Sequence, residues 1–206
     1  MKKRQRMGRF VRSVISKAPG IGRLASRANV SSGTAATGDV GPDGPIRRIE
    51  YNDGTDIMAT DDLAVLVGMV GLKLGLEPRG RPLIVNHWAT WCDGCVQELP
   101  NLVTLRAQTR DTADFVGVGW EGFSGGGGPS DWIMRVDEVS RKNALSWSTM
   151  VFEGAAQELF ENFDFEVQTI PQTWVYSAEG TLVFRQQGEI TKPNIDQILT
   201  AIGVSK

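Results

Sequence analysis

The chain has 206 residues, of which 41% are hydrophobic and 22% are charged, and its net charge is −2. This length suits one domain with extensions, and the hydrophobic fraction is enough to build a sizeable core. A near-neutral charge gives no indication of nucleic-acid binding, so we expect a globular protein without a nucleic-acid partner.

The net charge hides an asymmetry along the chain. Residues 1–27 contain nine Lys and Arg and no acidic residue, whereas the remainder has 13 basic and 24 acidic residues, a net charge of −11. The apolar residues of this basic segment are too interrupted for a clear signal peptide or a transmembrane segment. We favour a disordered basic segment. The alternative is an amphipathic helix that contacts a membrane surface or directs targeting.

The composition divides the chain into three parts. Residues 28–45 are rich in Ser, Gly, Thr, Ala and Pro, which is typical of a linker. We therefore predict a basic, disordered tail and linker (1–45), a β/α extension of the core (46–79) and a main domain (80–206). In the extension, an Asn-Asp-Gly turn separates short extended pieces, and residues 63–74 are predicted to be helical.

Strands and helices alternate in the main domain. The predicted strands are residues 83–88, 115–118, 146–152, 172–176 and 182–187. The predicted helices are residues 92–108, 131–143, 155–162 and 193–202. Parallel crossover units followed by an antiparallel pair predict an α/β fold with a mixed central sheet and helices on both faces.

The two cysteines, Cys92 and Cys95, form a Cys-x-x-Cys motif. A bridge across so short a loop would contribute little stability, so chemistry explains the pair better than a structural role. Cys92 opens a helix, where unpaired N–H groups and the helix dipole favour the thiolate. Cys95 lies one turn later on the same face and can attack a mixed disulfide. The motif therefore predicts a redox pair.

Three blocks of sequence resemble the thioredoxin superfamily, and within it the TlpA/ResA-like branch. They are LIVNHWATWCDGC (83–95) with Glu-Leu-Pro at 98–100, VQTIPQTWVY (167–176), and residues 179–188. They occur in the family's order and cover roughly residues 80–203. The resemblance implies a thioredoxin fold with an N-terminal extension, and the activity of a thiol–disulfide oxidoreductase.

The resemblance implies roles in catalysis for three residues. Cys92 matches the exposed attacking thiol, and Cys95 matches the buried resolving thiol. Glu98 matches a proton-transfer group near the buried cysteine, although the pattern also fits an exposed helix residue. Pro100 matches a proline that kinks the helix, which is a structural role.

Substrate binding is assigned to three further residues. By resemblance, Pro171 is a cis proline that faces the cysteines, and the backbone of Ile170 pairs with substrate peptide. Trp91, beside the motif, could shape the substrate surface.

The chain departs from the family pattern at several positions. Asn86 stands where thioredoxins have a buried Asp, and Thr169 replaces a common Gly. His87 replaces a usual Phe, and strand alternation points it to the opposite face from Asn86. Asp93 follows the nucleophile, and its charge opposes thiolate formation. We therefore expect a reductant with a potential below about −200 mV.

Two other functions stay open at this level. One is a thioredoxin-like copper or other metal chaperone, although two Cys and one His make a poor ligand set. The other is a redox-inactive interaction domain. For the oxidoreductase we expect no cofactor or metal, protein dithiols and disulfides as substrates, and an upstream electron-donor protein. The branch is usually periplasmic or membrane-tethered, and this sequence leaves the compartment open.

Overall fold

The computed structural model describes residues 47–51, 53–60, 80–123, 126–153 and 169–204. The tail and linker predicted at 1–45, and the helices predicted at 63–74 and 155–162, concern residues outside the described ranges.

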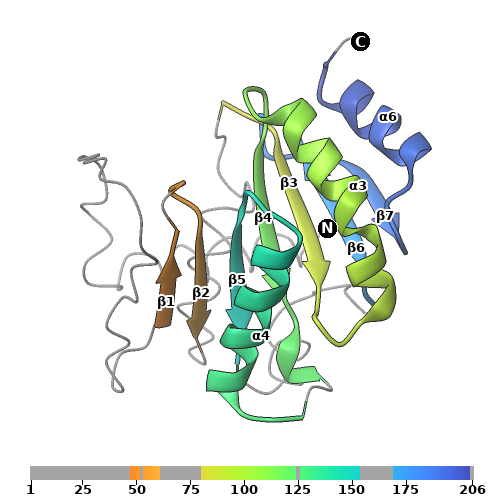
Figure 1. Ribbon diagram of the computed structural model, residues 1–206. Helices are drawn as coiled ribbons and strands as arrows, with labels where there is room; N and C mark the ends of the chain where they lie inside the picture. Colours follow the sequence, from red (N-terminus) through yellow and green to blue (C-terminus); the bar gives the residue numbers. More distant parts are fainter. Residues whose placement is uncertain (1–46, 52, 61–79, 124–125, 154–168, 205–206) are drawn as a thin grey trace, which may run out of the picture.

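A seven-stranded mixed sheet forms the centre of the molecule, in the order β1-β2-β5-β4-β3-β6-β7 (Figure 1). The central strands β2, β5, β4 and β3 pair in parallel, whereas β1, β6 and β7 each join their neighbour antiparallel. The strands are β1 (Arg47–Glu50), β2 (Asp56–Thr60), β3 (Leu83–Trp88), β4 (Asp114–Gly119), β5 (Ser148–Phe152), β6 (Gln172–Tyr176) and β7 (Leu182–Gln187). The predicted mixed sheet is confirmed.

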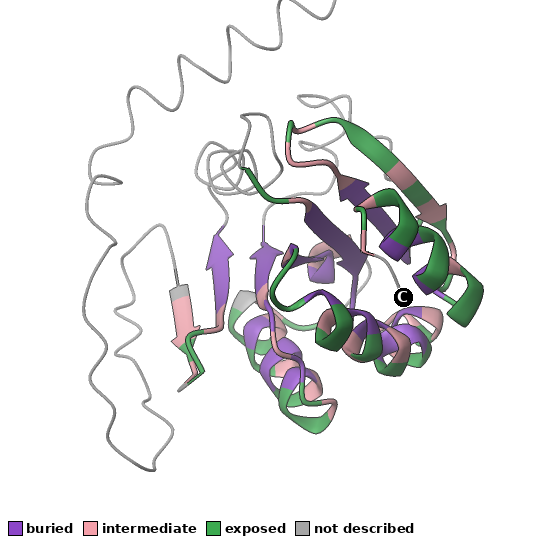
Figure 2. Ribbon diagram, turned by 90° about the horizontal axis from the view of Figure 1, so that it is seen from above, coloured by how far each residue is buried: buried purple, intermediate pink, exposed green. Residues whose placement is uncertain are grey.

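Three described α-helices cover one face of this sheet (Figure 2). They are α3 (Asp93–Thr109), α4 (Pro129–Lys142) and α6 (Lys192–Ala201). α4 begins two residues earlier than predicted, with a proline in its first turn, where a missing N–H costs nothing. In the described part of the chain, no helix is both long and apolar enough to cross a membrane.

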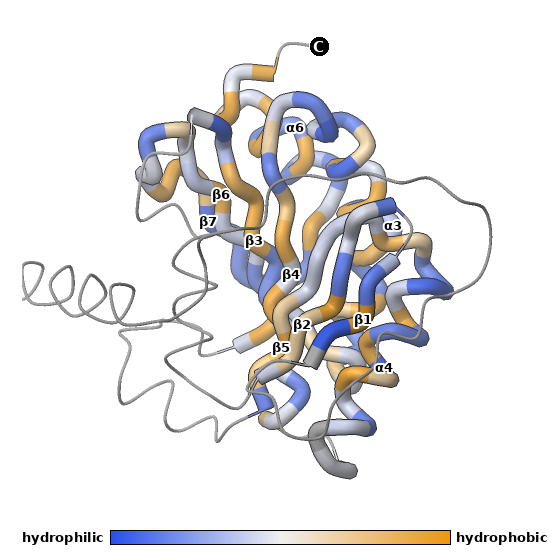
Figure 3. The backbone as a smooth tube through the Cα atoms, turned by 90° about the vertical axis from the view of Figure 1, so that its left-hand side faces the viewer, coloured by the Kyte–Doolittle hydropathy of each residue, from blue (hydrophilic) through white to orange (hydrophobic). Residues whose placement is uncertain are grey.

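Strand β3 lies inside the sheet, between β4 and β6, and all six of its residues are buried. Because side chains alternate along a strand, Ile84 and Trp88 pack in the apolar cluster beneath the helices, and Leu83 and Val85 pack on the second face. Figure 3 shows the hydrophobic character of the central strands. β3 thus supplies both cores and carries the chain to the start of α3.

The N-terminal extension contributes two strands to the same sheet. β1 and β2 form an antiparallel hairpin around the predicted Asn-Asp-Gly turn, where Gly54 adopts a positive φ of 81°. Thr55 donates from its backbone N and its hydroxyl to Asp53. β2 then pairs in parallel with β5. The sequence indicated the turn, but not this pairing with a distant strand.

Candidate active site

The two cysteines lie where β3 ends and α3 begins. The N–H of Cys92 donates to the carbonyl of Ala89 at 3.3 Å, which closes a turn between strand and helix. Cys92 is the N-cap of α3, and its sulfur accepts a hydrogen bond from the N–H of Cys95 at 3.3 Å. An N–H group of the first helical turn therefore points at this sulfur, which favours its thiolate once the pair is reduced.

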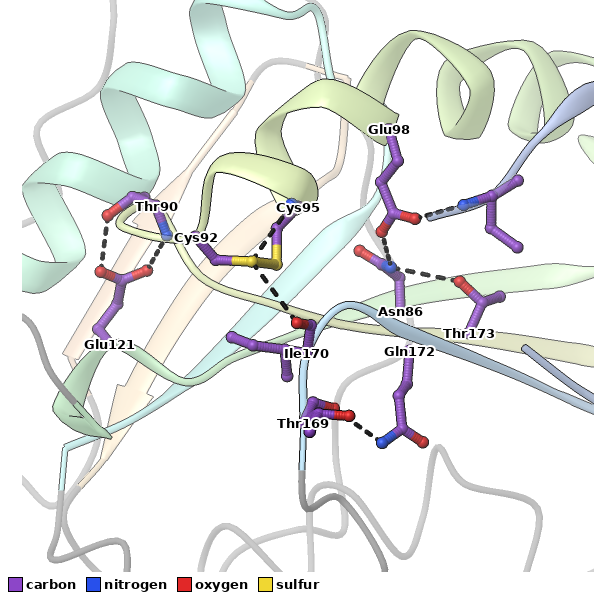
Figure 4. The surroundings of a disulfide bond; sticks show 11 residues. Asn86, Thr90, Cys92, Cys95, Glu98, Glu121, Thr169, Ile170, Gln172 and Thr173 are labelled. Carbon is purple, nitrogen blue, oxygen red and sulfur yellow. Dashed lines mark hydrogen bonds between the residues drawn. A yellow bond between two sulfur atoms is a disulfide. The ribbon is translucent and has the colours of Figure 1, made fainter. Parts of the chain in front are cut away.

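Cys92 and Cys95 are joined by a disulfide, with their Cα atoms 5.2 Å apart (Figure 4). Cys92 is partly exposed, whereas Cys95 is fully buried. The Cys92 side chain can therefore be reached from solvent, whereas the Cys95 side chain cannot. This asymmetry matches the order of attack that the resemblance implies.

A second loop meets the disulfide from the start of β6. The Ile170–Pro171 peptide bond is cis, and the carbonyl oxygen of Ile170 lies 3.8 Å from the Cys92 sulfur. Two hydrogen bonds to Thr169 hold the loop in place. The side-chain amide of Gln172 donates to the carbonyl of Thr169, and that of Gln187 donates to the hydroxyl of Thr169, both at 2.7 Å. Residues 170 and 171 are thus brought to the cysteines as predicted.

Glu98 is fully buried on α3, three residues after Cys95 and on the same helical face. One carboxylate oxygen accepts from the side-chain amide of Asn86 at 2.8 Å, and the other accepts from the backbone N of Ile190 at 2.7 Å. Burial raises the pKa of Glu98 to about 7, although both hydrogen bonds act to lower it. The exposed-residue interpretation is therefore wrong, and this carboxyl group can change protonation state near neutral pH.

Asn86 links the central strands to this carboxylate. Its amide nitrogen donates to Glu98 and also to the hydroxyl of Thr173 at 3.3 Å. At the position where thioredoxins have a buried acid, Asn86 therefore supplies a hydrogen-bond donor. The buried acid of this chain is Glu98, on α3.

Glu121 is a second buried carboxylate, which the sequence analysis did not identify. It begins the short 3-10 helix η1 (Glu121–Phe123) directly beyond β4, and it is fully buried. Its two oxygens accept from the backbone N and the hydroxyl of Thr90, both at 2.7 Å. Burial raises the pKa of Glu121. One signal could have found it, since β3 and β4 are parallel neighbours and the residues that follow them meet at one edge of the sheet.

His87 points away from the cysteine pair, to the opposite face from Asn86, as alternation predicts. It is fully buried, with its ring 4.5 Å from that of Trp174, and it accepts a hydrogen bond from the indole N of Trp120 at 3.2 Å. Burial, together with the charge of Arg185, lowers the pKa of His87 to about 3. This imidazole stays neutral.

Trp91 lies next to Cys92 and is half-buried against the apolar cluster of the second face. Within the described residues, no group of three or more His, Cys, Asp or Glu could hold a metal ion.

The chain is similar in part to thioredoxin-like and thiol:disulfide interchange proteins. No protein-family model matches the chain. It is 24% identical to the thioredoxin-like protein YneN of Bacillus subtilis, over 60% of this chain and 66% of that protein. It is 27% identical to the thiol:disulfide interchange protein HelX of Rhodobacter capsulatus, over 55% of this chain and 56% of that protein. The matched region thus spans less than two thirds of either relative.

Among solved structures, the chain is similar to that of StoA from Bacillus subtilis. The two are 18% identical, with a TM-score of 0.48, over 78% of this chain and 98% of StoA.

Proposed function

We propose that the chain is a thioredoxin-superfamily protein, similar to the TlpA/ResA-like branch, and that it is a thiol–disulfide oxidoreductase. The observation that carries the proposal is the asymmetric pair at the start of α3. A partly exposed Cys92 caps the helix, and a buried Cys95 lies one turn behind it. A partly exposed thiol in a field of N–H donors is a nucleophile, whereas a structural disulfide would gain nothing from that placement.

In the proposed reaction, the reduced pair transfers two electrons to a protein disulfide. The Cys92 thiolate attacks one substrate sulfur, which forms a mixed disulfide and releases the other substrate sulfur as a thiolate. The Cys95 thiolate then attacks the Cys92 sulfur, which forms the Cys92–Cys95 disulfide and releases the second substrate thiolate. The substrate gains two electrons and two protons, and the pair becomes oxidised.

Glu98 is the proton acceptor of the second step in this proposal. Cys95 is buried and must lose its proton before it can attack, and no water reaches its side chain freely. A carboxyl group with a pKa of about 7, one turn along the same helix, can take that proton near neutral pH and return it later.

Substrate peptide binds beside Cys92 in this proposal. The Ile170 backbone reaches the sulfur from the loop before Pro171, so an extended peptide that pairs with this loop brings its own sulfur to Cys92. Trp91 supplies an apolar surface next to the same position.

The direction that we propose is reduction of protein disulfides. The exposed charge of Asp93, directly after Cys92, opposes the thiolate, and a less stable thiolate makes the dithiol a better reductant. The Cys92–Cys95 pair is the only redox group that this reaction uses, with no cofactor or metal. An upstream dithiol protein returns the disulfide to the reduced form.

The proposal is tested by reduction of insulin in the presence of dithiothreitol, followed by turbidity. The wild-type protein is expected to accelerate precipitation, and Cys92→Ser is expected to reduce the rate to that of dithiothreitol alone. Cys95→Ser is the matched variant, because it keeps the attacking thiol and should accumulate a mixed disulfide on a non-reducing gel. Equal rates for wild type and Cys92→Ser would refute the proposal.

A further inference from the structure

Glu121 is a fully buried carboxylate whose two oxygens both bind a single residue, Thr90. Figure 4 shows it on the opposite side of the disulfide from Glu98. The proposed reaction makes no use of it. Burying a carboxylate is unfavourable unless hydrogen bonds compensate, and apolar side chains could fill the same space without that cost. The placement of this charge therefore calls for a functional explanation.

We propose that Glu121 is a positioning residue that holds the turn before Cys92 and thereby aligns the Cys92 sulfur with the start of α3. The inference rests on the proposed function for its use in catalysis. Thr90 lies in the middle of the turn that begins at Ala89 and ends at Cys92, so its two hydrogen bonds fix the turn at its centre.

The two hydrogen bonds between Glu121 and Thr90, called the clamp below, join two elements that are themselves held in place. On one side, the N–H of Trp120 donates to the carbonyl of Trp88 at 2.9 Å, which ties the residue before Glu121 to the end of β3. On the other side, Thr90 is two residues from the N-cap of α3. Both bonds to the carboxylate are 2.7 Å long, as expected for charge-assisted hydrogen bonds. The Glu121 carboxylate therefore connects the end of β4 to the turn between Ala89 and Cys92.

The position of the Cys92 sulfur matters because the hydrogen bond that stabilises its thiolate depends on distance and angle. The sulfur accepts from the N–H of Cys95 at 3.3 Å, and such contacts weaken steeply when their angle or distance changes. The helix field is also strongest within the first turn. A looser turn lets the sulfur leave this position, which raises the pKa of the Cys92 thiol and makes it a poorer nucleophile at neutral pH.

Other charged groups lie near the start of α3 or interact with Glu121, and none of them is substituted in the test. Asp93 and Glu98 belong to α3, and Arg135 of α4 interacts electrostatically with Glu121. Glu189, which precedes α6, reaches over Gly94, where an added Cβ would lie 3.1 Å from its carboxylate oxygen.

The test compares variants of equal charge in the full chain with Cys95→Ser, so that Cys92 is the only thiol. The rate of Cys92 alkylation by iodoacetamide is measured against pH. Glu121→Gln and Glu121→Ala both remove the charge, but the Gln amide keeps an acceptor for the Thr90 N–H and a donor for its hydroxyl oxygen. We expect the midpoint of the profile to lie about one pH unit higher for Glu121→Ala than for Glu121→Gln.

A second pair leaves Glu121 itself unchanged. Thr90→Ser keeps both arms of the clamp, whereas Thr90→Val loses the hydroxyl arm. The midpoint for Thr90→Val is expected above that for Thr90→Ser, by less than the difference in the first pair. This pair decides the question if Glu121→Ala does not fold.

Coincident midpoints within both pairs would overturn the inference. A midpoint that falls equally far below that of the Cys95→Ser parent in Glu121→Gln and Glu121→Ala would also overturn it, because the charge of Glu121 alone would then act on Cys92. Alkylation needs no protein substrate, so this result is independent of the insulin assay, and each proposal can fail while the other stands.

Discussion

Asn86 and His87 are neighbours on β3, both fully buried, and they face opposite sides of the sheet. The Asn86 side continues through hydrogen bonds to Glu98, on the helix that carries the cysteines. The His87 side is closed by the rings of Trp120 and Trp174. Burial favours the neutral form of the titratable group on each side, and it moves the pKa of Glu98 to about 7 but that of His87 to about 3. Only the group on the cysteine side can change its protonation state near neutral pH.

The largest expected difference between the two sides is the change in the pH dependence of stability caused by Glu98→Gln. The folded-state pKa of about 7 lies above the ordinary 4.5, so the folded protein binds more protons between these values, and stability is lost as the pH rises through this window. Between pH 4.5 and pH 8, the free energy of unfolding of the wild type should fall by about 3 kcal/mol relative to that of Glu98→Gln. Denaturant unfolding of the oxidised proteins measures it. Parallel pH profiles for the two proteins would contradict the assignment.

The second prediction concerns His87→Phe and has the opposite sign. The folded-state pKa of about 3 lies below the ordinary 6.5, so the unfolded chain binds more protons in between, and stability is lost as the pH falls below about 6.5. Between pH 7.5 and pH 5, the free energy of unfolding of the wild type should fall by about 2 kcal/mol relative to that of His87→Phe. Its insulin reduction should be unchanged, because His87 lies on the closed side. A loss of reductase activity would show that the two sides communicate.

The smallest expected effect is on Thr173→Val, which removes one of the two acceptors of the Asn86 amide. The 3.3 Å bond is long and Asn86 keeps its bond to Glu98, so we expect a loss of about 1 kcal/mol in the free energy of unfolding at pH 7. Thr173→Ser keeps the hydroxyl and serves as the control. A loss as large as that caused by Asn86→Ala would make Thr173, rather than Glu98, the main partner of the amide.

Local patterns predicted the elements that carry the cysteines. The apolar run predicted as strand 83–88 and the helix predicted after it at 92–108 are each indicated by residues close together in the sequence, and so are the strands predicted at 172–176 and 182–187. The structure has each of them at the expected position. Alternation along β3 likewise separated Asn86 from His87.

Contacts between distant segments could not be predicted in the same way. Glu121 stands in a Gly-rich stretch that looks solvent-exposed, and only the parallel pairing of β3 with β4 brings it to Thr90. The sequence favoured a functional role for Glu98 only slightly over an exposed helix position, because its burial depends on hydrogen bonds to the backbone of Ile190 and the amide of Asn86. Burial of a single polar residue depends on what packs over it, and that information is spread along the chain.

The reduction potential of the Cys92–Cys95 pair tests the central claim most directly. The protein is equilibrated against glutathione or dithiothreitol buffers, its thiols are alkylated, and the reduced fraction is read by mass spectrometry. A two-electron transition between about −200 and −300 mV is the result that we predict for a reductase supplied by a dithiol partner. A value above about −150 mV would contradict the reducing direction, and failure to form the intramolecular disulfide at all would contradict the oxidoreductase itself.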